Sequence, residues 1–145
     1  MNKPRVLFLC TGNSARSQMA EALLRKYGGD YFEVFSAGLQ PKGINPYTVR
    51  VLDEIGVDTR QHSSKTLAIF MGKAHFSYLI TVCSNAEDNC PIFPGMGTRL
   101  HWPFEDPAAF VGSEEETVVK FREVRDQIDA RVRAWLAEMN LSGGG

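Results

Sequence analysis

The chain has 145 residues, of which 43% are hydrophobic and 23% charged, as in a single globular domain rather than a disordered or fibrous protein. Its 16 Lys and Arg residues against 17 Asp and Glu residues give a net charge of -1, which argues against nucleic acid as a partner. The apolar runs are far shorter than the ~20 residues of a membrane span, and no signal peptide is recognised at the start, so we expect a cytoplasmic protein without membrane contact.

Strands and helices are predicted to alternate in the first part of the chain. Residues 5–9 form a nearly continuous apolar run, typical of a parallel strand buried on both faces. Helical spacing of apolar residues predicts a helix over residues 17–27, and residues 31–36 alternate as a second strand. Asn45 followed by Pro46 is typical of a helix start. The apolar stripe expected on this second helix, which ends at Gly56, consists of Val49, Leu52 and Ile55.

The middle of the chain predicts one further strand between two short helical segments. Ser64 is placed to cap a short helix over residues 65–71. Residues 76–82 form another apolar strand, which ends directly before Cys83. The polar residues between Cys83 and Cys90 predict one or two helical turns.

The last part of the chain predicts a weak strand and a long helix. Residues 98–102 give the strand, and Ser113 with Glu116 three residues later forms a capping box. We expect residues 1–139 to form one catalytic domain and residues 140–145 a flexible tail. The apolar residues at helical spacing after the capping box are Phe121, Val124, Ile128, Val132, Trp135 and Met139.

This alternation predicts a single α/β domain, with a four-stranded parallel sheet flanked by helices on both faces. In such folds, ligands bind beyond the carboxyl ends of the strands. Cys10, Cys83 and Asp106 each follow a predicted strand, so we expect all three at that edge of the sheet.

The segment from Cys10 to Ser17 has the pattern of an oxyanion-binding loop. Five residues separate Cys10 from Arg16, and a loop of this length between a strand and a helix can wrap its backbone N–H groups around a tetrahedral oxyanion. Arg16 can add bidentate hydrogen bonds, and Ser17 can stabilise Cys10 as a thiolate. The alternative is a buried structural cysteine with an arginine at this spacing by chance. The expected oxyanion-binding residues are Thr11, Gly12, Asn13, Ser14, Ala15 and Arg16.

The chain has three cysteines, Cys10, Cys83 and Cys90. This number is odd and too small for a disulfide framework, so it favours thiol chemistry in a reducing compartment. Six residues separate Cys83 from Cys90, so a continuous helix would place their Cα atoms ~10 Å apart. A disulfide requires ~7 Å or less, so the pair can bond only if residues 84–89 unwind. We therefore hypothesise a redox switch, against the alternatives of two buried thiols or a metal site. A metal is poorly supported because His62, His75 and His101 are scattered.

The Cys10, Arg16 and Ser17 pattern near the N-terminus resembles the nucleophile loop of the low-molecular-weight tyrosine phosphatase fold. Within that fold, the Cys83 and Cys90 pair and Asp106 before a proline are similar to the thioredoxin-coupled arsenate reductases. The resemblance implies that Cys10 attacks arsenate while Asp106 acts as the general acid. It also implies that Cys83 and then Cys90 complete a thiol relay reset by thioredoxin, in a monomer without a bound cofactor.

The chain departs from the tyrosine phosphatases of this fold after Asp106. These phosphatases place aromatic residues there, whereas this chain has Ala108 and Ala109, although Phe104 and Phe110 could partly substitute. Loss of a stacking wall disfavours phosphotyrosine more than a small oxyanion. A low-molecular-weight phosphatase and a thiol-based arsenite-binding or sensing protein stay open as alternatives, as does glutaredoxin as the electron donor.

The resemblance also implies a monovalent cation site near the nucleophile loop. Three of its positions match Asn13, Glu21 and Ser36, but the remaining acidic ligand falls at Lys65. We expect the Lys65 ammonium to replace the cation, so that no metal is bound. The alternative is an exposed lysine at the start of a helix.

Overall fold

The computed structural model describes residues 3–72, 75–90 and 96–141. The order of elements alternates between strands and helices, as the sequence predicts. In chain order the elements are β1 (Arg5–Cys10), α1 (Arg16–Gly28), β2 (Glu33–Gly38), α2 (Pro46–Asp53), the 3-10 turn η1 (Leu67–Ile69), β3 (Phe76–Thr81), α3 (Ser84–Asn89), β4 (Met96–His101), the 3-10 turn η2 (Pro107–Ala109) and α4 (Glu114–Glu138).

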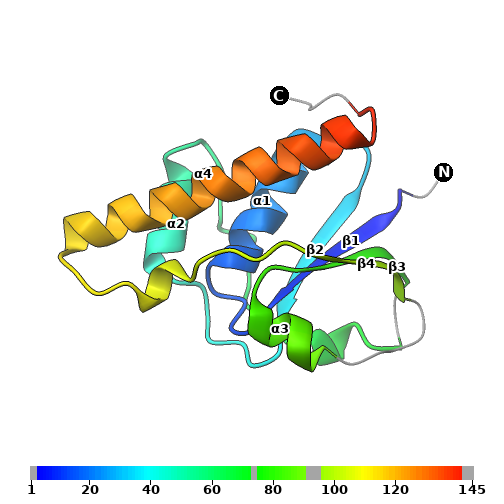
Figure 1. Cartoon of the computed structure of the whole chain (residues 1–145), viewed down its shortest axis with the longest axis horizontal. Helices are drawn as coiled ribbons and strands as arrows, with labels where there is room; N and C mark the ends of the chain where they lie inside the picture. The colour runs from blue at the N-terminus through cyan, green and yellow to red at the C-terminus, as the bar shows by residue number, and fades with distance from the viewer. Residues whose placement is uncertain (1–2, 73–74, 91–95, 142–145) are drawn as a thin grey trace.

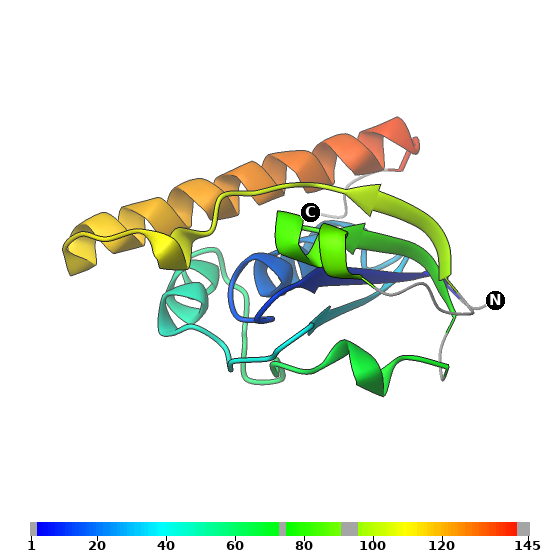
Figure 2. The same ribbon diagram turned by 60° about the horizontal axis from the view of Figure 1, so that its bottom comes forward.

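The four strands form one parallel sheet in the order β2-β1-β3-β4. On one face, α1 packs against β1 and β2, and α4 packs against α1 and α2. The much shorter α3 contacts β1 and β3 on the opposite side of the sheet from α4 (Figures 1 and 2). The sheet and its two helical layers therefore confirm the predicted fold class.

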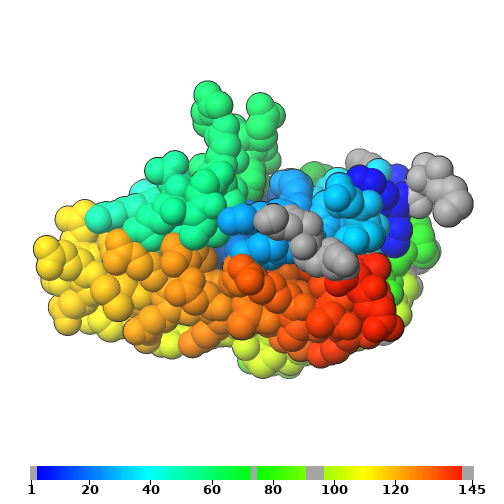
Figure 3. Space-filling model, turned by 90° about the horizontal axis from the view of Figure 1, so that it is seen from above, coloured from blue at the N-terminus to red at the C-terminus, as the bar shows by residue number. Residues whose placement is uncertain are grey.

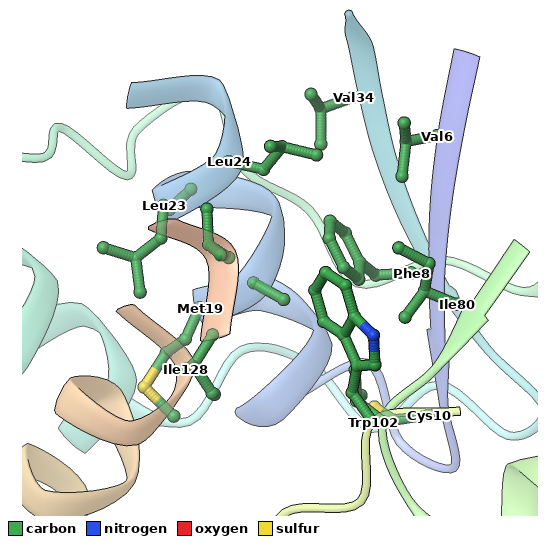
Figure 4. Close-up of a cluster of buried hydrophobic side chains, with 14 of the residues drawn as sticks. Val6, Phe8, Cys10, Met19, Leu23, Leu24, Val34, Ile80, Trp102 and Ile128 are labelled. Carbon is green, nitrogen blue, oxygen red and sulfur yellow. The ribbon is translucent and has the colours of Figure 1, made fainter. Parts of the chain in front are cut away.

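The main core fills the space between the sheet and helices α1 and α4. Phe8 of β1 contacts the Trp102 ring at a centroid distance of 5.8 Å, and Trp102 in turn contacts Trp135 of α4 at 5.5 Å. Because these apolar side chains meet at the end of β1, they anchor the strand that carries Cys10. Figure 4 shows Val6, Phe8, Cys10, Met19, Leu23, Leu24, Val34, Ile80, Trp102 and Ile128 in this cluster.

The long helix α4 spans the whole length of one face, as Figure 3 shows. Its start has the predicted capping box, in which the Ser113 hydroxyl accepts from the Glu116 amide at 3.1 Å and the Glu116 carboxylate accepts from the Ser113 amide at 3.0 Å. The predicted stripe is buried from Phe121 to Trp135. In the part of the chain that the structure describes, no helix is both long and apolar enough to cross a membrane.

The predicted helix over residues 65–71 is wrong. The structure has only the 3-10 turn Leu67–Ile69, and its cap is Thr66 rather than Ser64. The Ser64 hydroxyl instead donates to the Gly12 carbonyl at 3.1 Å. The Lys65 carbonyl accepts from the Gly38 amide at 2.8 Å, so this backbone continues the edge of the sheet and is not available for a helix.

Other predictions need smaller corrections. The strands predicted at residues 31–36 and 98–102 lie at Glu33–Gly38 and Met96–His101. In α2, Val49 is exposed, and the apolar residues that the helix buries are Val51 and Leu52. The helix ends at Asp53, earlier than predicted. Of the predicted tail, residues 142–145 lie outside the described residues.

Candidate active site

The loop between β1 and α1 is tightly built around the end of β2. Asn13 has a φ of 47°, in the left-handed region that allows the loop to curl back on itself. Gly38 lies directly beside the loop: a Cβ atom there would stand 2.7 Å from the Thr11 carbonyl oxygen and 2.8 Å from the Asn13 amide nitrogen. The loop can therefore approach β2 this closely only because residue 38 is glycine.

The Cys10 sulfur is buried and accepts hydrogen bonds from this loop. The Asn13 amide donates to Cys10 Sγ at 3.2 Å, and Ser17 Oγ lies 2.8 Å from the same sulfur. Asn13 Nδ2 donates to Ser17 Oγ at 2.8 Å, which leaves the Ser17 hydroxyl hydrogen available to the sulfur. The sulfur therefore has two hydrogen-bond donors directed at it, one from the loop and one from the first turn of α1.

Above the sulfur lies a pocket of about 100 Å³. Within the described residues, the backbone amides of Gly12, Ser14 and Ala15 donate no hydrogen bond inside the protein, and no side chain caps the start of α1. These N–H groups and the positive end of the helix dipole make a site for an anion. The pocket is well below the ~300–1,000 Å³ of sites for drug-sized ligands, so it suits a small oxyanion. The residues that line it are Cys10, Thr11, Gly12, Ser14, Ala15, Arg16, Lys42, Asp106 and Ala108.

Arg16 and Asp106 meet at the rim of the pocket. Arg16 Nη2 lies 3.6 Å from Asp106 Oδ2, while its Nη1 donates to the Phe104 carbonyl at 3.1 Å. The other Asp106 oxygen accepts from the Ala108 amide at 3.0 Å, which fixes the carboxylate at the start of η2. The guanidinium and a carboxylate are thus placed over the same sulfur.

The described lining of the pocket has no aromatic side chain against which a ligand ring could stack. Ala108 lines it, whereas within the described chain neither Phe104 nor Phe110 does. Phe104 instead borders a separate cavity of about 340 Å³ beside Trp102, and the Phe110 ring lies 5.7 Å from Lys120 Nζ. The two phenylalanines therefore do not replace the missing aromatic walls.

Cys83 lies against the same loop, on the side of α3. Its sulfur is buried, accepts from the Ala86 amide at 3.4 Å and lies 3.5 Å from Thr11 Oγ1. Asn85 Nδ2 donates to Thr11 Oγ1 at 2.8 Å, so the Thr11 hydroxyl hydrogen can point to Cys83. The first residue after Cys10 thus connects the loop to the second cysteine.

Cys90 follows α3 at its other end, and none of the three cysteines forms a disulfide in this structure. Burial raises the pKa of the Cys90 thiol, and the nearby Glu87 carboxylate raises that pKa further while the Arg99 guanidinium lowers it. The helix predicted between Cys83 and Cys90 is confirmed as α3, with Cys83 as its N-cap. In this state the two sulfurs are held at opposite ends of the helix.

The residues named for a cation site lie together behind the loop. Ser36 Oγ donates to Glu21 Oε1 at 2.5 Å and accepts from Asn13 Nδ2 at 2.9 Å. Lys65 Nζ lies 3.9 Å from Glu21 Oε1 and donates to the Ser63 carbonyl at 2.7 Å. Arg25 Nη2 lies 2.9 Å from the other carboxylate oxygen, Glu21 Oε2, so two cationic side chains face this buried carboxylate. In the described residues, no group of three His, Cys, Asp or Glu side chains is arranged to hold a metal.

Lys42 and Asn85 are site residues that the sequence analysis missed. Lys42 lines the pocket, and its aliphatic chain packs over Gly12. It follows β2 at the carboxyl edge of the sheet, a position that the rule for parallel sheets could have indicated. Asn85 had no comparable signal, because its contact with Thr11 spans 74 positions of sequence.

The match of the chain to a family model agrees with this geometry. Residues 5–142 match the family described as low molecular weight phosphotyrosine protein phosphatase, and the chain belongs to that family.

Among individual relatives, the chain is 44% identical to an arsenate reductase of Halalkalibacterium halodurans, over 93% of this chain and 96% of that protein. A structure described as an arsenate reductase in the phosphate binding state has a TM-score of 0.78 and 27% identity, and covers 93% of this chain and 98% of its own. The thioredoxin-dependent arsenate reductase of Corynebacterium glutamicum is 33% identical, with a TM-score of 0.71, over 96% of this chain and 63% of that one.

Proposed function

We propose that this chain is an arsenate reductase that uses Cys10, Cys83 and Cys90 in a thiol relay. One observation carries the proposal: Thr11 brings Cys83 to the Cys10 loop. Thr11 directly follows Cys10 in the chain, and its hydroxyl lies 3.5 Å from the Cys83 sulfur. A phosphatase needs the loop but has no use for Cys83. The similarity to arsenate reductases over 93% of the chain supports the same choice.

In the first step, the Cys10 thiolate attacks arsenic while the loop amides and Arg16 hold the oxygens of arsenate. An arsenic–oxygen bond breaks, and Asp106 gives its proton to the departing oxygen, which leaves as water. The Asp106 carboxyl lies at the rim of the pocket, beside Arg16, where such an oxygen would leave. The product is a covalent arseno-cysteine at Cys10.

In the second step, the Cys83 thiolate attacks the Cys10 sulfur. The sulfur–arsenic bond breaks and its electron pair stays on arsenic, so that As(V) becomes As(III) and arsenite leaves. The two thiols lose these two electrons and form a Cys10–Cys83 disulfide. The Ala86 amide and the Thr11 hydroxyl, which face the Cys83 sulfur, stabilise the attacking thiolate.

In the third step, the Cys90 thiolate attacks the Cys83 sulfur, and Cys10 departs as a thiolate. A Cys83–Cys90 disulfide forms, and the Asn13 amide and Ser17 hydroxyl stabilise the departing Cys10 thiolate. Residues 84–89 must unwind for this bond, because α3 holds the two cysteines apart. A dithiol donor then reduces the disulfide.

We propose thioredoxin as that donor, because a structural relative with 33% identity is described as thioredoxin-dependent. In this account the protein works as a cytoplasmic monomer, with residues 1–139 as the catalytic domain and residues 140–145 as a tail. It needs no bound cofactor.

Lys65 takes the place of a monovalent cation behind the loop in this proposal. Its ammonium lies 3.9 Å from one oxygen of the buried Glu21 carboxylate, which accepts from Ser36, while the Arg25 guanidinium lies 2.9 Å from the other oxygen. Asn13 donates to that same serine and also to Ser17, so this charge helps to hold the residues around the Cys10 sulfur.

The relay is tested by trapping it one step before its end. With arsenate, thioredoxin, thioredoxin reductase and NADPH, the wild type should produce arsenite over many turnovers, and replacing thioredoxin by glutaredoxin and glutathione should lower the rate. Cys90→Ser should release at most one arsenite per protein and accumulate a Cys10–Cys83 disulfide, detected by intact mass and peptide mapping. Sustained turnover by Cys90→Ser would refute the third step.

A further inference from the structure

A pair of opposite charges fastens α3 to the edge strand β4. Arg99 Nη2 lies 2.5 Å from Glu87 Oε1, and the same nitrogen donates to the Glu87 carbonyl. The other carboxylate oxygen of Glu87 lies 3.5 Å from His101 Nδ1. Both partners of the Arg99–Glu87 pair are about 30% exposed, so the pair is partly shielded from water.

The same two charges act on Cys90. It is the C-cap of α3, three residues after Glu87, whose carboxylate and carbonyl both bind the Arg99 guanidinium. The Glu87 carboxylate raises the pKa of the Cys90 thiol and the Arg99 guanidinium lowers it, so that the two effects oppose each other while the pair is closed. His101 is a further titratable group at this contact: its Nδ1 lies 3.5 Å from Glu87 Oε2 and 2.8 Å from Thr81 Oγ1.

The guanidinium of Arg99 has an unused donor in this arrangement. Its Nε is buried and, within the described residues, has no hydrogen-bond partner, while Nη2 serves Glu87. A buried N–H without an acceptor is unfavourable, so a movement that brings an acceptor to it is favoured. A thiolate is such an acceptor.

Opening of α3 moves the Glu87 carboxylate but not the Arg99 guanidinium. Glu87 lies inside α3, the segment that must unwind before Cys90 can reach Cys83, whereas Arg99 lies on a strand of the sheet and stays in place. Unwinding thus removes the carboxylate and leaves the guanidinium. The positive charge becomes unpaired at the moment when Cys90 has to act as a nucleophile.

We propose that Arg99 is a positioning residue for Cys90: Glu87 occupies it while α3 is folded, and it holds the Cys90 thiolate when the helix opens. This inference rests on the three-cysteine relay proposed above. It assigns to one ion pair two consecutive roles, in keeping the reduced helix closed and in preparing the last attack.

The test measures the thiol itself and needs no arsenate. In a Cys10→Ser/Cys83→Ser background Cys90 is the only cysteine, and serine at position 83 can still cap α3. The rate of alkylation by iodoacetamide is followed by intact mass between pH 6 and about pH 10, the range in which thiols titrate. Glu87→Gln, Arg99→Gln and Arg99→Lys are compared, with Arg60→Gln, which breaks the exposed Asp58–Arg60 pair, as the matched control.

The two partners should move the pH midpoint in opposite directions. Arg99→Gln should raise the midpoint and Glu87→Gln should lower it. At a fixed pH below the midpoint, the thiolate fraction should therefore fall about three- to tenfold in Arg99→Gln and rise by a similar factor in Glu87→Gln. Arg99→Lys should stay near the wild type, as should Arg60→Gln. If the pair only supported the helix, both Gln variants would loosen α3 alike, and shifts in the same direction or no shift would overturn the proposal.

A second measurement separates this proposal from the relay. In a single turnover with arsenate, Arg99→Gln with all three cysteines present should release arsenite at the wild-type rate but lose the Cys10–Cys83 intermediate about three- to tenfold more slowly. Decay of that intermediate at the wild-type rate in Arg99→Gln would overturn the proposed role of Arg99. Absence of any arsenite from the wild type would instead refute the proposed function and leave the alkylation result standing.

Discussion

The Cys10 loop and the α3 segment carry the two chemically active ends of the site, but they are held very differently. The loop is fixed by a buried network centred on Asn13 and by the close approach of Gly38. The six-residue α3 buries only Ala86 against the sheet, and its polar contacts with other elements include those of Glu87 with Arg99 and His101 and that of Asn85 with Thr11. In the proposed relay, the loop is therefore the fixed part that binds the anion and α3 is the part that opens.

The largest effect is expected where the loop meets the chemistry. Cys10→Ser should abolish arsenate reduction and any hydrolysis of aryl phosphates, with a loss of at least about a thousandfold in both rates, because the nucleophile is gone. Both activities are measured on the same preparation, and the melting temperature serves as the control for folding. Retention of either activity would remove Cys10 from its assigned role.

Asp106→Asn should lower the rate of the first step by roughly a hundredfold, because the departing oxygen loses its proton donor. Phosphate, a competitor for the pocket, should still bind, since the loop amides and the Arg16 guanidinium remain in place and Arg16 loses only its ion pair with Asp106. Rapid-quench measurement of arseno-cysteine formation checks the rate. An unchanged rate would show that another group supplies the proton.

Gly38→Ala tests how far the loop depends on its fixed shape. The added methyl group would meet the Thr11 carbonyl and the Asn13 amide, so we expect destabilisation by about 1–3 kcal/mol and a clear rise in KM for arsenate. Gly43→Ala is a matched control, since a Cβ atom at that position meets nothing within 4 Å, although its φ of 87° also disfavours alanine. Thermal unfolding and steady-state kinetics measure the two effects, and an unaltered KM for Gly38→Ala would contradict a pre-organised loop.

Amide hydrogen exchange compares the two regions directly. The amides of α3 should exchange faster than those of the first turns of α1 in the reduced protein, and oxidation to the Cys83–Cys90 disulfide should increase exchange in α3 alone. The reason is that α3 is short and must unwind for the disulfide to form. Exchange in α3 that did not respond to oxidation would sink the idea of a switch.

The smallest effect concerns the charge behind the loop. If Lys65 replaces a monovalent cation, exchange of sodium for potassium should change the wild-type rate by less than about twofold, and Lys65→Asp should create a potassium requirement. Steady-state rates at constant ionic strength measure this. Strong activation of the wild type by potassium would show that a cation is used in spite of the lysine.

The same contrast explains what the sequence could predict. The loop residues from Cys10 to Ser17 are contiguous, so their spacing, together with the strand before them and the helix after them, predicts an anion cradle and a contact between Ser17 and the Cys10 sulfur. The capping box at Ser113 is equally local and was also confirmed. Features that are encoded over a few neighbouring residues are therefore readable without a structure.

Features that depend on which loops meet were not predicted. Lys42 and Asn85 reach the site only through the packing of other elements against the Cys10 loop. The helix predicted after Ser64 failed for the same reason, since the Ser64 hydroxyl donates to the Gly12 carbonyl and the Lys65 carbonyl accepts from the Gly38 amide. Local propensity gave way there to contacts between distant segments.

The participation of Cys83 in the reaction is tested by comparing the wild type with Cys83→Ser. NADPH consumption with thioredoxin, thioredoxin reductase and arsenate is measured for the wild type and for Cys83→Ser, alongside hydrolysis of an aryl phosphate by both. The account predicts that Cys83→Ser loses arsenate-dependent consumption and keeps whatever phosphatase activity the wild type has. A wild type that consumes no NADPH with arsenate but hydrolyses aryl phosphates equally well with or without Cys83 would contradict it.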